Sequence, residues 1–316
     1  MPNQRCYQVV TFTMNPALDL FGRTEHIFDD SKSRCIQTAL LPGGGGLNVA
    51  RNVRRMGSDS FAIFPSGGPN GRYLEQLLKD EQQPYQAIAI DQHTRQNLGI
   101  TDVGRGVMHH FVFPGPRLSR SELAACVAAI CQQHAPWLVL SGSLGEGVEA
   151  DFYAKIIARV RQQGTRVLLD TSGVALQGSL YQGAYLAKLN RKEFASLGYP
   201  EDASVAELAE QMQDLVAKGA VEVLIVTLNR GGAVLVQRDS QPVYVSAPAV
   251  HIVSHVGAGD SFMSALAHQL NQGAPLVQAF RYGVAAALVT VQCEGNQLED
   301  LDWLERAYTE VVETPF

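Results

Sequence analysis

The sequence predicts an α/β protein in which helices cover a mostly parallel sheet and a smaller β-sheet stands beside it. Three observations lead to this fold class. Apolar strand patterns alternate with amphipathic helix patterns, two long apolar helix patterns occur late in the chain, and two earlier stretches carry short strands of alternating polarity. The first two features are typical of βαβ units packed in layers, and the third of a separate, half-exposed sheet.

The short strands lie in residues 15–41 and 86–113. The second stretch contains strand patterns at 96–102 and 107–113 on either side of the turn Gly104-Arg105-Gly106, which predicts a hairpin. A sheet built from two chain segments beside an α/β core suits a lid. We therefore expect a single domain, residues 1–316, that carries this lid.

The core strands are predicted where apolar runs are bounded by glycine or proline, most clearly at 137–140, 166–170 and 221–227. Amphipathic stretches at 149–163 and 204–218 separate these runs and predict helices. Continuous apolar strands with intervening helices indicate a parallel sheet that is buried on both faces.

The last third of the chain predicts two helices that pack against the sheet. Residues 259–270 and 276–291 are rich in Ala, Val and Leu. A helix that is apolar around most of its circumference is usually buried.

Composition excludes several functional classes. The chain has 316 residues and a formal net charge of −6, whereas nucleic-acid binders usually carry a basic stripe. No stretch reaches the roughly 18 uncharged apolar residues that span a bilayer, and residues 1–10 lack the pattern of an export signal. Five cysteines without C-x-x-C spacing suggest reduced thiols. We expect a cytoplasmic protein that binds neither nucleic acid nor membrane.

The strongest chemical signal is the run Gly257, Ala258, Gly259 and Asp260 at the start of a helix pattern. Small side chains leave the first N–H groups of the helix open, and the helix dipole adds positive potential there. Such a turn can hold phosphate oxygens, and Asp260 can accept the proton of an attacking hydroxyl. Alternatively, Asp260 is an N-terminal capping residue, although a cap needs none of the three small residues.

Two common nucleotide-binding motifs are missing from the sequence. It contains no G-x-x-x-x-G-K-S/T loop, and its glycine clusters do not reproduce G-x-G-x-x-G after the first strand. A Rossmann-type dehydrogenase is therefore the weakest alternative.

Residues 42–51, Pro-Gly-Gly-Gly-Gly-Leu-Asn-Val-Ala-Arg, together with 257–260 resemble the two signature regions of the PfkB, or ribokinase-like, family of carbohydrate kinases. The resemblance covers nearly the whole chain and implies a three-layer αβα core with a β-sheet lid. The runs at 94–98 (Thr-Arg-Gln-Asn-Leu) and 141–144 (Ser-Gly-Ser-Leu) are similar to those of the family's phosphofructokinases. This implies ATP-dependent phosphorylation of a hexose phosphate, first of all fructose 6-phosphate to fructose 1,6-bisphosphate.

The resemblance also implies roles for single residues on the acceptor side. Asp260 matches the family's catalytic base, and Gly257, Ala258 and Gly259 match its anion hole. The positions that match sugar contacts are Asp19, Gly44, Gly45 and Asn48. Those that match contacts to the sugar's phosphate are Lys32, Arg34, Arg95 and Ser143. Without the resemblance, the four glycines would be read as a flexible loop, Asp19 as a solvated acid at a strand end, and Arg95 as a surface charge.

On the nucleotide side, Asn190 and Glu193 match an N-x-x-E element that organises Mg²⁺ through water, which suits the sparse oxygen coordination of this ion. The same pair is a helix-capping arrangement. The positions that match ATP contacts are Lys188, Asn190, Lys192, Thr227, Asn229, Gly232, Val284 and Leu288. The last two are equally compatible with a helix core. Ser254, Val256 and Gly295 match backbone positions that bind a monovalent cation such as K⁺ in some relatives.

Four departures from the family pattern leave alternatives open. Leu189 replaces a proline, Asn229 a glycine, Gly145-Glu146 a proline pair and His255 a threonine. None of these departures removes a catalytic group. They leave the choice of acceptor sugar open, with fructose 1-phosphate and tagatose 6-phosphate as the alternatives. Because Asn229 stands in the nucleotide turn, a non-catalytic sugar- or nucleotide-binding regulator is an alternative from another class.

The resemblance implies an assembly as well. The strand pattern at 107–113 has alternating apolar positions, and relatives often pair two lids. We therefore expect a homodimer that forms through the lid.

Overall fold

The computed structural model describes residues 6–228, 231–293, 298 and 300–316. Within them, the large sheet has ten strands in the order β14-β13-β12-β11-β10-β9-β8-β1-β4-β5. Its strands are β1 (Val9–Phe12), β4 (Ser60–Ser66), β5 (Tyr85–Ala89), β8 (Trp137–Ser141), β9 (Arg166–Asp170), β10 (Leu186–Asn190), β11 (Val223–Thr227), β12 (Ala233–Gln237), β13 (Val243–Ser246) and β14 (Val312–Thr314). The strands from β5 to β11 in this order are parallel, whereas β12, β13 and β14 pair antiparallel.

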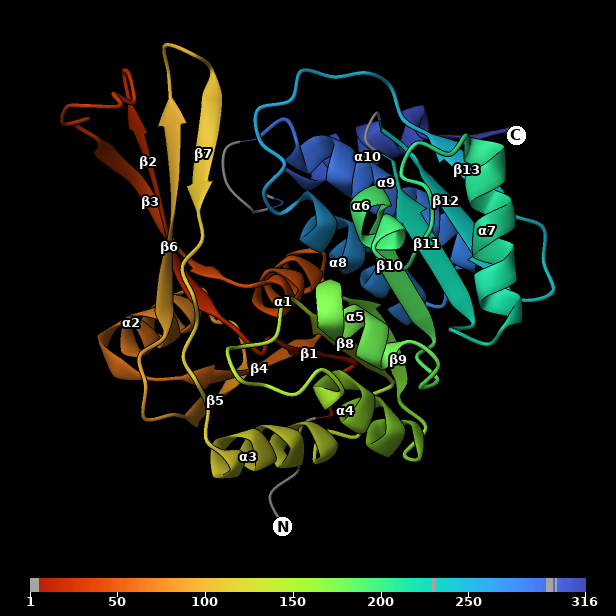
Figure 1. Ribbon diagram of the computed structural model, residues 1–316, viewed down its shortest axis with the longest axis horizontal. Helices are drawn as coiled ribbons and strands as arrows, with labels where there is room; N and C mark the ends of the chain where they lie inside the picture. The colour runs from red at the N-terminus through yellow and green to blue at the C-terminus, as the bar shows by residue number, and fades with distance from the viewer. Residues whose placement is uncertain (1–5, 229–230, 294–297, 299) are drawn as a thin grey trace.

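Helices cover both faces of this sheet (Figure 1). One face carries α3 (Arg120–Cys131), α4 (Phe152–Arg161), α5 (Gly173–Ser179), α6 (Arg191–Ala195) and α7 (Val205–Ala217). The other face carries α1 (Gly45–Arg55), α8 (Ala258–Asn271), α9 (Leu276–Thr290) and α10 (Leu301–Glu310). Val10 and Phe12 join the core of the first face and Val9 that of the second, because side chains alternate across a strand. The predicted three-layer αβα core is confirmed.

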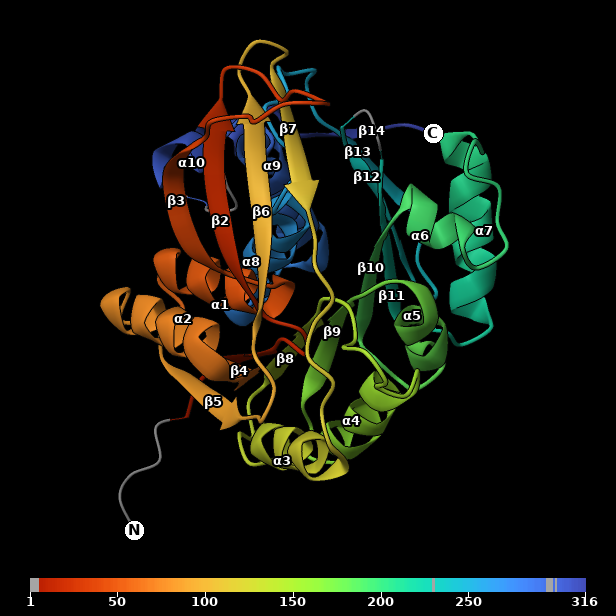
Figure 2. The same cartoon turned by 60° about the vertical axis from the view of Figure 1, so that its left-hand side comes forward.

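The small sheet contains β2 (Ala17–Thr24), β3 (Ile36–Gly43), β6 (Arg95–Asp102) and β7 (Val107–Phe111) in the order β3-β2-β6-β7. Its strands come from two separate chain segments, because β2 pairs in parallel with β6. In Figure 2 this sheet stands upright above α2 (Gly68–Asp80) and beside the core. The small sheet contacts the core through Met108 of β7, whose sulfur lies 3.5 Å from the Ser254 hydroxyl.

The predicted strands and helices are found with small shifts of their ends, but one boundary was wrong. Residues 85–89, most of which were assigned to the lid, form β5 at the edge of the large sheet, where Tyr85 pairs with Ala62 of β4. A short alternating strand fits the edge of either sheet, so periodicity alone does not decide between them. Among the described residues, no helix has both the length and the apolar character needed to cross a membrane.

Candidate active site

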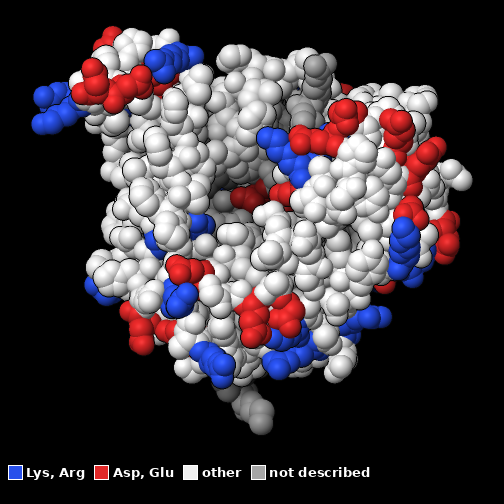
Figure 3. All heavy atoms as spheres, in the orientation of Figure 1, with Lys and Arg blue, Asp and Glu red and all other residues white. Residues whose placement is uncertain are grey.

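Most of the predicted site residues gather at the carboxyl ends of the parallel strands. The strand order reverses between β1 and β8, since the chain continues from β1 outward to β4 and β5 but from β8 outward to β9, β10 and β11. Ligands of open α/β sheets bind at such a reversal. Figure 3 shows a hollow between the small sheet and the core, with acidic side chains at its floor.

The start of α8 forms one wall of this site. Gly257 precedes the helix with φ +80°, and no side chain of the described chain caps the helix there. A left-handed conformation favours glycine. Asp260 is the third residue of the helix and its carboxylate turns to α1, where Asn48 Nδ2 donates to Asp260 Oδ2 at 2.8 Å. The capping alternative for Asp260 is therefore wrong.

The surroundings of Asp260 change its acidity. Burial raises the pKa of this carboxyl to about 6, and the negative charge of Asp170 acts in the same direction. The Asn48 hydrogen bond and the Lys188 charge lower it in part. A carboxylate with a pKa this close to neutrality is suited to take up a proton during a reaction.

The four glycines are part of regular structure and not a flexible loop. Gly43 ends β3, and Gly45 begins α1 after Gly44, which has φ +111°. A Cβ atom on Gly45 would lie 2.2 Å from Ser141 Oγ and 3.1 Å from Asp260 Oδ1. The first turn of α1 thus packs directly against the end of β8 and the Asp260 carboxylate, which requires a residue without a side chain.

Asp19 lies on β2 and is only 6% exposed, so the interpretation as a solvated acid is wrong. Asn97 Nδ2 donates to Asp19 Oδ1 at 2.9 Å. A Cβ on Gly43 would meet the Asp19 carboxylate at 2.0 Å. Burial raises the pKa of Asp19 against the opposing effects of Asn97, His110, Arg95 and Arg51.

Arg95 lies close to Asp19 at the start of β6. Its Nη1 donates to the Phe113 carbonyl and its Nη2 to the Asn15 carbonyl, both at 3.0 Å, while the buried Nε has no partner within the described structure. Burial lowers the pKa of Arg95. Arg95 is therefore a partly buried group with a free donor and not a surface charge.

The other predicted phosphate contacts are more exposed. Ser143 lies on the surface in the loop after β8. Lys32 and Arg34 are exposed in the loop between β2 and β3, and β2 extends roughly 17 Å from Asp19 to Thr24 before that loop begins. The structure does not bring these two cations to Asp19.

On the opposite side of the hollow, Asn190 and Glu193 cap α6. Asn190 Oδ1 accepts from the Glu193 N–H at 2.9 Å and Glu193 Oε2 from the Asn190 N–H at 2.8 Å. The predicted capping arrangement is confirmed. Burial and the nearby Asp170 raise the pKa of Glu193, against the effects of the Asn190 N–H and Lys188.

Lys188 lies beneath the start of α8. Its side chain is buried and its Nζ is 3.0 Å from Asp170 Oδ1. A Cβ on Gly259 would lie 3.2 Å from the Lys188 ammonium. The ion pair with Asp170 therefore holds the Lys188 ammonium in place under the open turn.

The remaining predicted residues have mixed positions. Thr227 ends β11, Gly232 has φ +93° beside the β13 backbone, and Lys192 is exposed on α6. Val284 and Leu288 are 4% and 7% exposed within the core cluster of α8 and α9, as the alternative interpretation had it. Asn229 and Gly295 lie outside the described residues.

The segment predicted to bind a monovalent cation is tied to the end of α9. The N–H groups of Val253 and Ser254 both donate to the Val291 carbonyl, and the Val256 N–H donates to Ser254 Oγ at 3.1 Å.

Three residues of the site were not selected from the sequence: Asp170, Ser141 and Asn97. Asp170 and Ser141 end β9 and β8. Asp170 and Ser141 could have been identified from the sequence, because they are polar residues at the carboxyl ends of predicted parallel strands. Asn97 lies in the run 94–98 that carries the family resemblance, but its hydrogen bond to Asp19 joins residues that are 78 positions apart and has no local signal in the sequence.

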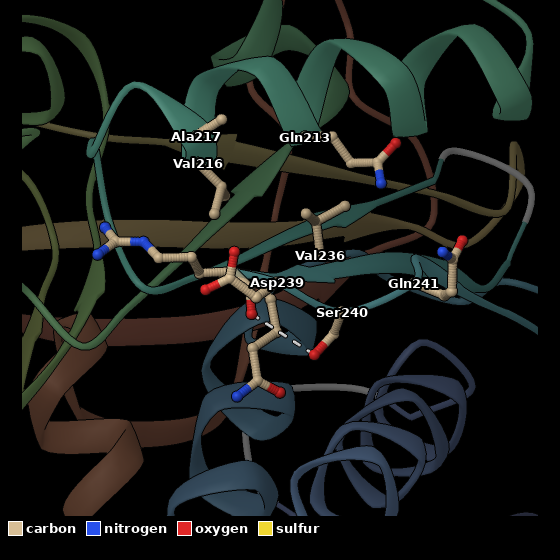
Figure 4. Close-up of a pocket in the computed structure, with 9 residues that line it drawn as sticks. Gln213, Val216, Ala217, Val236, Asp239, Ser240 and Gln241 are labelled. Atoms are coloured by element: carbon tan, nitrogen blue, oxygen red, sulfur yellow. Dashed lines mark hydrogen bonds between the residues drawn. The ribbon is translucent and has the colours of Figure 1, made fainter.

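A second hollow lies apart from this site. It measures about 230 Å³ and is lined by Val216 and Ala217 of α7 and by Val236, Arg238 and Asp239 (Figure 4). None of the predicted site residues within the described chain lines it.

The comparison with known proteins identifies the family of this chain. Residues 12–303 match the model of the pfkB family of carbohydrate kinases. The chain belongs to this family. The pfkB assignment excludes the dehydrogenase alternative, in agreement with β1, which is followed by β2 of the small sheet and not by a glycine turn and a helix.

Among pfkB relatives, the chain is 34% identical to ATP-dependent 6-phosphofructokinase isozyme 2 of Escherichia coli over 95% of this chain and 98% of the relative. It is 29% identical to 1-phosphofructokinase of Bacillus subtilis over 90% of this chain and 93% of the relative. The crystal structure of Escherichia coli phosphofructokinase-2 in complex with potassium superposes with a TM-score of 0.90 at 33% identity, covering 96% of this chain and 98% of that one.

Proposed function

We propose that this pfkB protein transfers the terminal phosphoryl group of ATP to a hydroxyl of fructose 6-phosphate and forms fructose 1,6-bisphosphate. The observation that carries the proposal is the Asp260 carboxylate, held by Asn48 at the uncapped start of α8. A base and an anion-binding turn side by side meet the main needs of phosphoryl transfer.

In this reaction Asp260 accepts the proton of the attacking hydroxyl. The N–H groups at Gly257, Ala258 and Gly259 face the charge that develops on the transferred phosphoryl group, and the helix dipole favours it. Lys188 adds a positive charge beneath the same turn. Asp19 accepts hydrogen bonds from other hydroxyls of the sugar and so holds the attacking one in line.

ATP binds toward α6 and the end of β11, and its phosphates carry Mg²⁺. The negative charge of Asp170 raises the pKa of Glu193 on this side of the hollow, so a bound cation would relieve the repulsion between the two carboxylates. Sparse oxygen ligands of this kind fit a magnesium ion that keeps part of its water shell. Asn190 and Glu193 would hold the ion through water. When bound, it neutralises phosphate charge.

The choice of a phosphorylated sugar rests on Arg95. Its buried Nε has no partner in the described structure, and burial keeps the guanidinium poorly solvated, so an incoming phosphate would satisfy a donor that is now unpaired. Ser143 would add a hydroxyl. The choice of fructose 6-phosphate rests on the relative at 34% identity, whose structure has also been solved with fructose-6-phosphate.

A coupled ADP-release assay tests the proposal with fructose 6-phosphate, fructose 1-phosphate, tagatose 6-phosphate and free sugars as acceptors. The highest kcat/KM is expected for fructose 6-phosphate. Dominant turnover of fructose 1-phosphate or tagatose 6-phosphate would move the assignment to those kinases, and dominant turnover of a free sugar would overturn the phosphosugar assignment. Binding of ATP and sugar without ADP release would favour the regulator.

We further propose a homodimer that forms through the small sheet, a K⁺ site at Ser254 and Val256, and a cytoplasmic location, where ATP and hexose phosphates are available. The exposed side chains of Phe111, Val112 and Ile36 on or beside the small sheet support the dimer. The Escherichia coli relative has been solved in complex with potassium and in a tetrameric inhibited form.

A further inference from the structure

Asn97 is a buried amide that joins three separate segments of the chain. It is 5% exposed on β6. Its Nδ2 donates to Asp19 Oδ1 on β2 at 2.9 Å, and its Oδ1 accepts from the Phe113 N–H beyond β7 at 3.2 Å. Both polar ends of this side chain are therefore used, one on the carboxylate of Asp19 and the other on backbone.

The strand register places Asn97 on the face of the small sheet that looks toward the sugar site. Asn97 stands directly opposite Asp19 in the β2–β6 pair. Arg95, two residues earlier and hence on the same face, donates to the Phe113 carbonyl. Arg95 and Asn97 thus hold the Phe113 backbone from both sides.

The Asp19 carboxylate has little freedom to rotate. The Asn97 amide occupies Oδ1, and Gly43 lies so close to the carboxylate that a Cβ there would meet it at 2.0 Å. A carboxylate has about four acceptor positions. The amide takes one of them and leaves the others, including those of Oδ2, for further donors.

We propose that Asn97 is a positioning residue for the acceptor sugar, which orients the Asp19 carboxylate through its amide so that the remaining lone pairs meet the sugar hydroxyls. The inference rests on the proposed function, in which Asp19 binds the sugar. Asn97 itself does not touch the reacting atoms.

Two substitutions separate this role from the bond to Phe113. Asn97→Ala removes both hydrogen bonds. Asn97→Asp retains an acceptor for the Phe113 N–H but, when ionised, has no donor for Asp19 and adds a like charge beside it. Both variants are expected to raise the KM for the acceptor sugar about 10- to 100-fold, as expected for loss of a hydrogen bond to a charged group, with the KM for ATP changed less than about twofold.

The pH dependence of Asn97→Asp distinguishes positioning from a merely structural role. Two carboxylates at hydrogen-bond distance share one proton, and the protonated Asp side chain again donates to Asp19. Its KM for the sugar, divided by the wild-type value at the same pH, is therefore expected to fall as the pH falls from 8 to 6. Wild type and variant share the other charged groups that act on Asp19, so the effects of these groups on KM cancel in the ratio. They are His110 of β7, Arg95 of β6, Arg51 of α1 and Asp260 of α8.

Gln96→Glu is the matched control. Gln96 adjoins Asn97 on β6 but points to the opposite face, so the variant adds the same charge away from Asp19 and should leave the sugar KM within about twofold. If Asn97→Ala does not fold, Asn97→Asp decides. A sugar KM within twofold of wild type, or a KM ratio that does not change with pH, would overturn the inference; a wild-type protein without turnover of any sugar would instead refute the proposed function.

Discussion

At the carboxylate of Asp260, burial and the neighbouring Asp170 raise the pKa, while the Asn48 amide and the Lys188 ammonium lower it. The outcome is a carboxyl group with a pKa of about 6, compared with 3.8 for an unperturbed aspartate. Removing a charge from water is costly, and here the hydrogen bond from Asn48 and the more distant Lys188 ammonium offset that cost only in part. The buried charge therefore costs folding stability at this position, and the raised pKa suits the proposed role of Asp260 as a base near neutral pH.

Replacement of Asp260 by Asn should abolish most of the activity and stabilise the fold. We expect kcat to fall about 10²- to 10⁴-fold, the usual contribution of a general base. A raised pKa means that the ionised form is disfavoured in the folded state. The destabilisation is fully present above pH 6 and is lost as the pH falls toward 3.8, so at pH 7 the variant should gain about 1–3 kcal/mol of unfolding free energy.

Steady-state kinetics and denaturant unfolding measure both effects. Asp214→Asn, on the exposed surface of α7 beside Lys218, is the control and should change neither quantity appreciably. A kcat near the wild-type value in Asp260→Asn would contradict the assignment of the base.

Activity should fall on the acid side of its pH profile with a midpoint near pH 6, because Asp260 must be ionised to accept the proton. The phosphate of the substrate titrates in the same range, with a second pKa of about 6, so the profile of wild type alone is ambiguous. Asn48→Ala removes a hydrogen bond that lowers the Asp260 pKa, and the acid limb should therefore move to higher pH. If the acid limb of Asn48→Ala does not move, the titrating group is the phosphate of the substrate and not Asp260.

Two helices, α1 and α8, begin at the same site, and a glycine precedes each of them, Gly44 and Gly257. The start of α1 contacts Ser141 and Asp260 through Gly45, and that of α8 lies on Lys188 through Gly259. Both helix N-termini therefore direct positive potential toward the hollow, where phosphate groups are proposed to bind. The absence of side chains allows this close approach.

Gly45→Ala tests the packing between these elements. The new Cβ would lie 2.2 Å from Ser141 Oγ and 3.1 Å from Asp260 Oδ1, so the Asp260 carboxylate or the helix must move. We expect kcat/KM to fall at least about tenfold, since small displacements of reacting groups are costly. Thermal stability should change little, because the nearest clashing atom is the end of the Ser141 side chain and Ala, compared with Gly, lowers the conformational entropy of the unfolded chain.

The double variant Gly45→Ala with Ser141→Ala should recover part of the lost activity, because the nearest clashing atom is gone. A double variant with activity no higher than the product of the two single effects would speak against this steric cause.

At the scale of the whole molecule, the small sheet has two faces of different character. The face with Asp19, Asn97 and Arg95 looks toward the hollow. On the opposite face, the register aligns Leu20, Leu40, Leu98 and Phe111 in one stripe across all four strands. These side chains are only partly buried, and Phe111 is 47% exposed. An apolar stripe on a sheet is commonly covered by a partner, which supports the proposed dimer.

Leu98→Lys should weaken the dimer by placing a charge in this stripe. Light scattering is expected to give a dimer for wild type and a monomer for the variant at micromolar concentration. Thr101→Lys, on the other face of the same strand, is the control and should leave the dimer intact. A wild-type monomer would contradict the dimer, and an unchanged assembly of Leu98→Lys would show that it uses another surface.

The sequence by itself determined the fold class and pointed to Asp260 as the proposed base. The strand at residues 166–170 and the helices at 204–218 and 259–270 were predictable because hydrophobic periodicity is a local property of the chain. Asp260 and its three small neighbours were recognisable because the proposed anion-binding turn is contiguous in sequence.

Only the tertiary structure decided how these parts meet. Asn48 binds Asp260 across 212 residues, and Asn97 binds Asp19 across 78. The role of Asp170, the sheet to which residues 85–89 belong and the position of Lys32 and Arg34 away from Asp19 likewise depend on how distant segments pack. A pKa or a hydrogen bond is set by neighbours in space and by their exclusion of water, and no local pattern in the chain records which neighbours those will be.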